Sequence, residues 1–188
     1  MNEELKPQHT NRETLDLVQH KALYPDWLEK MRPHLEASDW ATAFRTYPSL
    51  RFPDGPWQTP TLPLSASRIG LFSTAGAYIS GDQPPFDAEN IEGDWRHREL
   101  SAGLGPAELE IAHTHFNHQS ALEDLDSVYP IHRLKELAAG GVIGELADRV
   151  YSISGYCLRA DLLVKQTIPA IVQGMREDGV QAALFIPV

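Results

Sequence analysis

Three short stretches of apolar residues, at 69–74, 108–112 and 182–186, each lie next to small or turn-forming residues. A nearly continuous apolar run is typical of a strand buried on both faces, and alternation of apolar and polar residues is typical of a half-buried strand. The pattern therefore predicts strands at all three places, with 182–186 a buried last strand. Residues 150–153 are a weaker fourth candidate.

Apolar residues recur at helical spacing in three other stretches. Residues 11–46 have this spacing, and Pro25 and Pro33 are expected to interrupt it. Residues 131–139 also have it and run into two glycines, which is a typical signal for the end of a helix. Residues 161–177 are a further helix candidate despite an internal proline.

Proline content divides the chain. Prolines are dense between residues 48 and 67, and such density excludes both a helix and a central strand. We therefore expect a helical N-terminal arm at 1–47, a proline-rich linker at 48–67 and an α/β domain at 68–188. Within that domain, residues 80–106 are rich in turn formers and are expected to form a long ordered loop.

The alternation of strands and helices predicts the fold class. It favours an α/β fold with a mostly parallel Rossmann-like or flavodoxin-like sheet, helices on both faces, and the helical arm in addition. Ligands of such sheets bind at the carboxyl ends of the strands. If the strands share one sheet, that rule brings Ser73, Thr74, Gly76, His113 and Val188 to one rim, where we expect the site.

The composition of the chain argues against some classes of binding partner. The chain has 188 residues and a formal net charge of −10, with no cluster of basic residues of the kind that nucleic acid or an anionic membrane requires. The acidic start carries no apolar run, so neither a signal peptide nor a membrane span is expected. The lone Cys157 excludes an intramolecular disulfide. Together these features favour a cytoplasmic protein.

Histidines at the end of the second predicted strand could bind a metal. His113, His115 and His118 are of the type that ligates zinc or iron, and residues two apart on a strand point the same way. Strand-end histidines also commonly bond to nearby carboxylates or line a substrate pocket. The spacing leaves both interpretations open.

Charged residues of the long loop offer a second candidate. Asp82 begins a rigid Pro-Pro-Phe turn, while Asp94 precedes a basic cluster that contains Arg98. Guanidinium groups can clamp a substrate carboxylate, but an ordinary salt-bridged loop has the same composition.

The nucleotide-binding glycine motifs are absent from the sequence. Cys157 is interpreted as a buried structural cysteine rather than a reactive thiol.

Several motifs occur in a characteristic order from about residue 68 to residue 188. They are Ser73-Thr74-Ala75-Gly76, Gly81-Asp82-Gln83-Pro84-Pro85-Phe86, Gly93-Asp94 with Arg98-Glu99, His113, Asp124, Tyr129-Pro130-Ile131-His132-Arg133-Leu134-Lys135-Glu136-Leu137, Gly141-Val142-Ile143-Gly144-Glu145, Tyr151-Ser152 with Gly155, and Asp178-Gly179-Val180 before Leu184-Phe185-Ile186-Pro187-Val188. In this order the motifs resemble the glycine/sarcosine/betaine/D-proline reductase selenoprotein B family, including its short bacterial relatives.

The resemblance implies a chemistry. Family members are oxidoreductases in which a selenol or thiol attacks the substrate-derived centre and a disulfide-type bond is the acceptor. The redox residue of the family is a selenocysteine or cysteine that follows the position of Val188, and Cys157 does not match it. A UGA selenocysteine codon read as a stop would explain an end at Val188. The codon after Val188 tests that hypothesis.

The resemblance also suggests roles for individual residues. His113, Asp124 and Arg98 are expected to be catalytic, with His113 a proton donor. A set of substrate-binding residues is expected beside them: Ser73, Thr74, Gly76, Asp82 and Asp94. The expected partners are a small amine-type substrate, a thiol reductant or a partner subunit, and further copies of the chain in a homo-oligomer. Two alternatives stay open, a metal-binding protein or metalloenzyme using the three histidines, and a non-catalytic subunit of a reductase complex.

Overall fold

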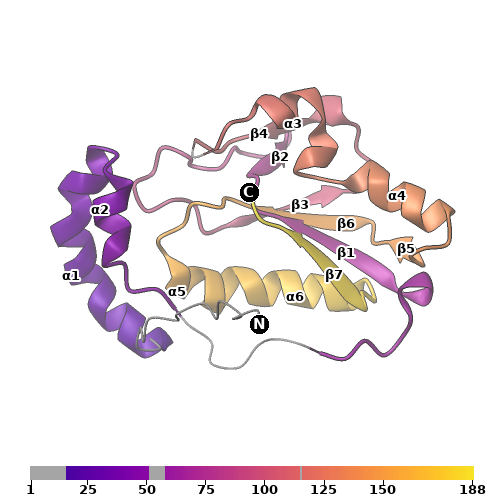
Figure 1. The fold of residues 1–188 in the computed structure, drawn as a ribbon, viewed down its shortest axis with the longest axis horizontal. Helices are drawn as coiled ribbons and strands as arrows, with labels where there is room; N and C mark the ends of the chain where they lie inside the picture. Colours follow the sequence, from indigo (N-terminus) through magenta and orange to yellow (C-terminus); the bar gives the residue numbers. More distant parts are fainter. Residues whose placement is uncertain (1–15, 51–57, 115) are drawn as a thin grey trace, which may run out of the picture. The chain divides into compact units, whose positions relative to one another are not determined.

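The computed structural model describes residues 16–50, 58–114 and 116–188 (Figure 1). The chain divides into two compact units, residues 1–57 and 58–188. Each unit is described by itself. Part of the predicted linker, residues 51–57, lies outside the described residues.

The first unit contains two helices, α1 at Leu17–Glu36 and α2 at Trp40–Arg45. Helix α1 begins with a capping box, in which the backbone N–H of Gln19 donates to Asp16 Oδ1 at 2.8 Å and the backbone N–H of Asp16 donates to Gln19 Oε1 at 2.9 Å. This reciprocal pair satisfies N–H groups that a helix start leaves open. The expected helical character is confirmed for Leu17–Glu36 and Trp40–Arg45, and residues 1–15 of the predicted arm lie outside the described residues.

Neither proline interrupts α1, so that expectation is wrong. Pro25 and Pro33 both lie inside the helix, where a proline ordinarily costs about 3 kcal/mol. Tyr24 and Trp27 share a buried face of α1, and the rings of Trp27 and Tyr47 meet edge to face with centroids 4.9 Å apart. This aromatic packing offsets the cost of the prolines, because tertiary contacts outweigh intrinsic helix propensity.

The second unit is built on a five-stranded sheet. Its strands are β1 (Arg68–Ser73), β3 (His97–Ser101), β5 (Glu145–Leu146), β6 (Arg149–Ile153) and β7 (Ala182–Ile186). Strand β1 pairs in parallel with β5, β6 and β7, while β3 pairs antiparallel with β6. The α/β class is therefore confirmed. The sheet is mixed, however, with three parallel pairings and one antiparallel pairing, and it is not clearly the mostly parallel Rossmann-like or flavodoxin-like sheet that the sequence predicts.

A separate two-stranded antiparallel sheet joins β2 (Ala77–Ile79) to β4 (Leu109–Ile111). Strand β4 is the second strand predicted from the sequence, so the condition that the predicted strands share one sheet is not met. The predicted loop at 80–106 also contains the strand β3. Its burial alternates, since Arg98 and Leu100 are buried, His97 is half-buried, and Glu99 and Ser101 are exposed. Because one of the two buried positions is occupied by an arginine, the hydrophobic pattern of the sequence does not show this alternation.

Helices and single helical turns connect the strands. They are η1 (Leu64–Ala66), η2 (Pro106–Glu108), α3 (Gln119–Glu123), η3 (Leu125–Ser127), α4 (Ile131–Ala139), α5 (Ala160–Leu162), the π-helical η4 (Leu163–Thr167) and α6 (Ile168–Glu177). Helix α4 occupies the predicted residues. The helix predicted at 161–177 is also present, and Pro169 lies in the first turn of α6, directly after the π-helical turn. Proline is tolerated in a first turn.

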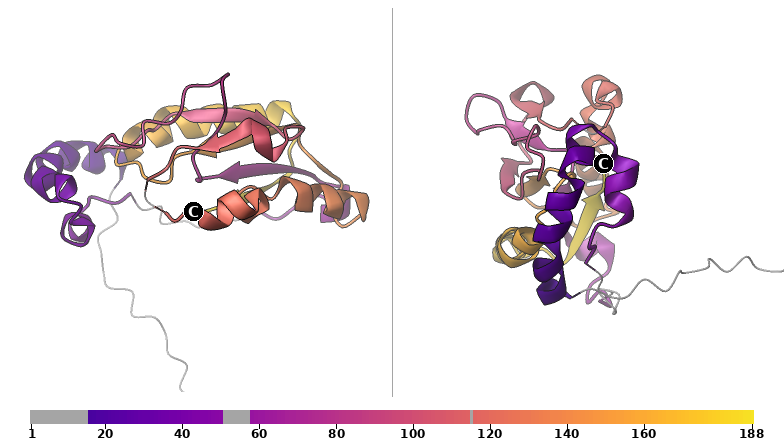
Figure 2. Two further views of the ribbon diagram at one scale, coloured as in Figure 1. Left: turned by 90° about the horizontal axis from the view of Figure 1, so that it is seen from above. Right: turned by 90° about the vertical axis from the view of Figure 1, so that its left-hand side faces the viewer.

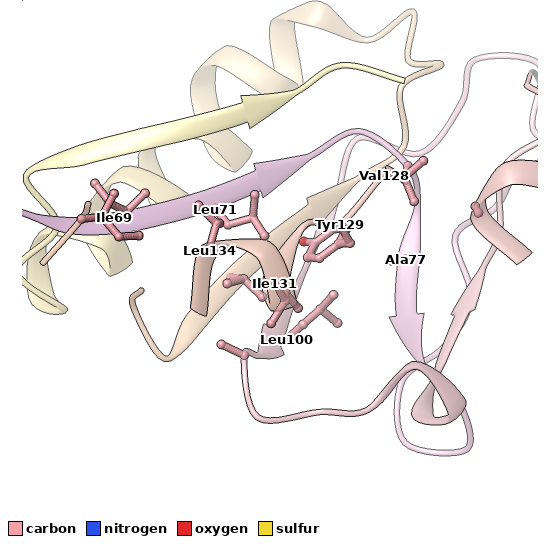
Figure 3. Packing of buried hydrophobic residues seen from close by; sticks show 13 residues of the cluster. Ile69, Leu71, Ala77, Leu100, Val128, Tyr129, Ile131 and Leu134 are labelled. Atoms are coloured by element: carbon pink, nitrogen blue, oxygen red, sulfur yellow. The ribbon is translucent and has the colours of Figure 1, made fainter. Parts of the chain in front are cut away.

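Helices α4 and α6 cover opposite faces of the sheet, as Figure 2 shows from above. Ile69 and Leu71 of β1 pack in one cluster with Ile131 of α4 (Figure 3). Phe72 points to the other face and packs with Ile171 of α6. Successive side chains of a strand alternate between faces, so a single apolar run supplies both clusters. This confirms the prediction of helices on both faces.

Strand β7 forms where the sequence predicts it, but it is not buried. Among the described residues it pairs only with β1, so it is an edge strand. Leu184 is 37% exposed and Phe185 is 52% exposed. The prediction of a buried last strand is therefore wrong. Among the described helices, none has the length and apolar character that crossing a membrane requires.

Candidate functional site

The carboxyl ends of β1, β6 and β7 lie at the same end of the sheet, because these strands run in parallel or share a parallel neighbour (Figure 1). Beyond β1, the backbone N–H of Thr74 donates to the carbonyl of Ile186 at 3.1 Å. Beyond β7, the backbone N–H of Val188 donates to Thr74 Oγ1 at 2.8 Å. The loop after β1 and the segment after β7 are therefore tied together. We call this end of the sheet, with residues 74–76, 113, 153–155 and 186–188, the rim.

Gly76 connects the rim to the small sheet. It has a φ of +71°, a conformation that favours glycine, and a Cβ there would lie 2.7 Å from the carbonyl oxygen of Ala112. Its N–H donates to Ile153 at the end of β6, and its carbonyl accepts from Ala112 at the end of β4, at 2.9 and 3.0 Å. No larger residue fits between the two sheets. This contact brings His113 to the rim although β4 is outside the main sheet.

His113 is 4% exposed, and its imidazole lies beside Gly155 together with atoms of the other rim segments. A Cβ at Gly155 would lie 3.0 Å from His113 Nε2, 3.1 Å from the carbonyl oxygen of Val188 and 3.2 Å from that of Thr74. Groups from three separate segments therefore converge on one glycine. The rim contains the predicted Thr74, Gly76 and His113 together.

Ser73 makes structural hydrogen bonds at the end of β1. It is fully buried, its hydroxyl donates to the carbonyl of Val128 at 2.8 Å, and the same oxygen accepts from the backbone N–H of Ala75 at 3.2 Å. These bonds hold β1 against the segment that leads into α4. The structure thus gives Ser73 a structural contact, and its role in binding substrate stays a prediction.

Asp94 is buried beside an arginine. Arg96 donates to both of its carboxylate oxygens, at 2.8 and 2.7 Å, and the backbone N–H groups of Arg96 and Asp87 donate as well. Burial alone raises the pKa of Asp94, but these hydrogen bonds outweigh it and the pKa is lowered overall. Both carboxylate oxygens of Asp94 thus already accept hydrogen bonds from residues of its own loop.

Arg98 is 7% exposed and holds the Pro-Pro-Phe turn. Its guanidinium donates to the carbonyls of Pro84, Pro85 and His97 at 3.0, 3.1 and 3.1 Å, and lies 4.2 Å from the centre of the Phe86 ring. Several of its N–H groups are therefore occupied by the backbone. Asp82 is exposed in the turn after β2. The structure places neither residue among those that meet at Gly155.

Asp124 and His118 line a cleft of about 750 Å³ between α4 and the small sheet. Acidic and basic side chains share this cleft: Glu110, Glu123, Asp126, Glu136, His132 and Arg133. Asp124 itself accepts a hydrogen bond from the backbone N–H of Asp126 at 3.0 Å, which begins η3. His113 is not among the lining residues, so the predicted pair of His113 and Asp124 belongs to two different places.

The three-histidine metal alternative stays a prediction. Phe116 lies between two of the histidines, with ring centroids 5.1 Å from His113 and 4.5 Å from His118. His115 lies outside the described residues. In the described part of the chain, no three histidine, cysteine or acidic side chains are grouped closely enough to hold a metal ion.

Cys157 lies beyond the rim, where it forms an isolated bridge with Gly93. Burial raises the pKa of its thiol to about 11, so the thiol is protonated near neutral pH. A protonated thiol is a poor nucleophile. This fits the interpretation of Cys157 as a structural residue.

Sequence reasoning located the rim but missed Gly155 as part of it. The signal was available, since Gly155 follows the predicted strand at 150–153 and the carboxyl-end rule applies to that strand as well. The contact with His113 was not available from the sequence, because β4 belongs to another sheet.

The fold and the rim define an α/β protein whose candidate site lies at the carboxyl ends of parallel strands. The profile of the family described as glycine/sarcosine/betaine reductase selenoprotein B matches residues 44–187. The chain therefore belongs to that family, which confirms the resemblance seen in the motifs.

One relative is the D-proline reductase subunit gamma of Acetoanaerobium sticklandii, which is 24% identical over 129 residues. The alignment covers 69% of this chain and 52% of the relative, so the matched region spans about half the length of that protein. No solved structure matches the chain.

Proposed function

We propose that this chain forms the substrate-reducing part of a selenol- or thiol-dependent reductase that acts on a small amine-type compound. The observation that carries the proposal is the meeting of His113, Thr74 and Val188 at Gly155. In the family, the redox residue follows the position of Val188. A selenocysteine or cysteine bonded to the Val188 carbonyl would therefore start at the rim, close to the His113 imidazole.

The proposed reaction is a two-electron reduction of a C–N bond. A substrate C–N bond and two thiol or selenol groups are converted to a C–H bond, the amine set free from that carbon with its own substituents, and one disulfide or selenenylsulfide. The selenolate or thiolate is the nucleophile, since the anion is the reactive form. We assign to His113 the role of donating a proton to the leaving amine or receiving the proton of the selenol or thiol.

The remaining candidate residues make their contacts elsewhere in the second unit. We propose that Arg98 positions the loop after β2, since its guanidinium holds three backbone carbonyls. Asp94 and Arg96 form the ion pair beside it. We assign no direct contact with the reacting atoms to Asp124, because it lines the separate cleft.

The test is amine-dependent oxidation of a dithiol by the protein isolated from the cells that produce it. Glycine, sarcosine, betaine and D-proline are supplied in turn with dithiothreitol, and the product of C–N cleavage is measured against the disulfide formed. That product is a released amine for the three open-chain compounds and the ring-opened amino acid for D-proline. We expect one compound to give a 1:1 ratio, and His113→Gln to lower kcat by about 100-fold or more.

His132→Gln is the matched control, because His132 is an exposed histidine of α4. It should keep wild-type activity. Absence of turnover with all four compounds, or full activity in His113→Gln, would contradict the proposal.

A second candidate is a subunit that contributes its site only within a complex. The relative from Acetoanaerobium sticklandii carries the name of a reductase subunit, and this observation favours the second candidate. Isolation at low salt followed by mass spectrometry tests it. A second polypeptide that remains bound in constant ratio would support it, and a full turnover rate for the isolated chain would rule it out.

A further inference from the structure

Gly155 differs from three other glycines of the second unit, Gly81, Gly141 and Gly179, in the reason that the position needs glycine. Gly81, Gly141 and Gly179 have positive φ angles, and a Cβ at any of them would meet nothing within 4 Å. Gly155 is not among the residues with positive φ. Its backbone conformation therefore accepts any residue, and only the space beside it is restricted.

That space is bounded by groups with little freedom to move. The Thr74 and Val188 carbonyls belong to backbone segments tied together by the bond from the Val188 N–H to Thr74 Oγ1. The imidazole of His113 is packed edge to face against Phe116, with centroids 5.1 Å apart. A Cβ at Gly76 would lie 3.3 Å from the Cβ of His113, so the backbone there closes the other side.

We propose that Gly155 is a positioning residue that sets the spacing between His113 Nε2 and the backbone at Val188. The proposal rests on the proposed function, in which His113 exchanges a proton at the atoms that follow Val188. Because glycine has no side chain, the imidazole and the Val188 carbonyl can both approach the same backbone point. A methyl group at 155 would approach all three neighbours at 3.0 to 3.2 Å and would push at least one of them away.

A displacement of this kind should affect the reaction more than the fold. Gly155 is exposed, so the added methyl group strains only local contacts at the surface end of the sheet. Misplacement of a catalytic group by about 1 Å can lower a rate by about 100-fold. A displacement of a few tenths of an ångström should therefore lower kcat by about 10-fold.

The experiment is a double-mutant cycle on kcat. Gly155→Ala is compared with wild type, and Gly155→Ala/His113→Gln is compared with His113→Gln. If Gly155 acts through His113, the alanine should lower kcat by about 10-fold in the first comparison and by less than about twofold in the second, because residues that act as a unit are not additive. Equal losses in the two comparisons, or no loss in the first, would overturn the proposal.

Gly105→Ala is the matched control. Gly105 also has no positive φ, and a Cβ there would meet its nearest atom, Glu108 Oε2, at an ordinary 3.6 Å. This variant should keep wild-type kcat.

A second readout does not depend on the reductase assay. The ¹³Cε1–¹H resonance of His113, assigned with the help of His113→Gln, should shift in Gly155→Ala and stay unchanged in Gly105→Ala. A shift without any reductase activity would contradict the proposed function and leave the positioning role intact. An unchanged resonance in Gly155→Ala would overturn the positioning role itself.

Discussion

Leu71 and Leu184 are direct neighbours on adjacent parallel strands, and their surroundings differ completely. They are register partners of β1 and β7, so they point to the same face of the sheet. Leu71 is fully buried against the cluster that includes α4, whereas Leu184 is 37% exposed. Both strands are apolar runs of similar length. The comparison shows that an apolar run predicts a strand more reliably than it predicts the depth at which that strand is buried.

The two leucines give the largest expected contrast in stability. Leu71→Ala removes a fully buried side chain and leaves a cavity, and should lower the free energy of unfolding by about 3 kcal/mol. Leu184→Ala is the matched control and should lower it by less than about 1 kcal/mol, since much of its side chain is already in water. Urea unfolding followed by circular dichroism measures both. Equal losses would show that β7 is covered in solution.

Packing between β6 and α6 offers a smaller test on the opposite face. A Cβ at Gly174 of α6 would lie 2.1 Å from the hydroxyl oxygen of the fully buried Tyr151. Alanine favours a helix over glycine by up to about 1 kcal/mol, but overpacking costs about 1–3 kcal/mol. Gly174→Ala should therefore lower the free energy of unfolding, by about 1–2 kcal/mol.

Tyr151→Phe supplies the control for this overpacking. The Tyr151 hydroxyl has no hydrogen-bond partner among the described residues, so its removal should cost little. In the Tyr151→Phe background, Gly174→Ala should be neutral or stabilising. A loss of the same size in both backgrounds would mean that the hydroxyl is not the obstacle.

The smallest expected effect concerns the turn before β7. Asp178 accepts two hydrogen bonds from Arg149 of β6, both at 2.8 Å, and these bonds lower the pKa of its carboxyl group. A group whose pKa is lowered by folding stabilises the fold above its unfolded pKa, about 3.9, and loses that effect as the pH falls through the folded pKa. Asp178→Asn should lower Tm by about 2 °C at pH 7.

The pH dependence decides whether the ion pair is responsible. The difference in Tm between wild type and Asp178→Asn should shrink as the pH falls below about 4 and should vanish in stronger acid. A difference that is constant from pH 7 to pH 2 would assign the effect to the changed side chain and not to its charge.

Local signals predicted a large part of this fold. Strand β1 and helix α4 appear where their apolar spacing and glycines indicate, because short-range preference and burial agree there. The carboxyl-end rule also located Thr74, Gly76 and Val188 at one rim. These predictions depend on neighbours in sequence or on a general property of parallel strands.

The incorrect predictions depend on contacts that are distant in sequence. Strand β3 was hidden because Arg98 is buried by carbonyl groups and an aromatic ring, which no hydrophobic pattern shows. Helix α1 contains Pro25 and Pro33 because its aromatic face is packed. The exposure of β7 depends on which strands pair on its other side, and no residue within β7 determines that.

The pairing of β1 with β7 also has a consequence for biosynthesis. Arg68 at the start of β1 bonds to Gln181 just before β7, a separation of 113 residues along the chain. A ribosome adds about 5–20 residues per second, so β7 is synthesised roughly 6–23 s after β1. During that time the apolar side chains of β1 have no partner on that edge. We therefore expect nascent chains of this protein to depend on chaperones that shield β1 until the last strand leaves the ribosome.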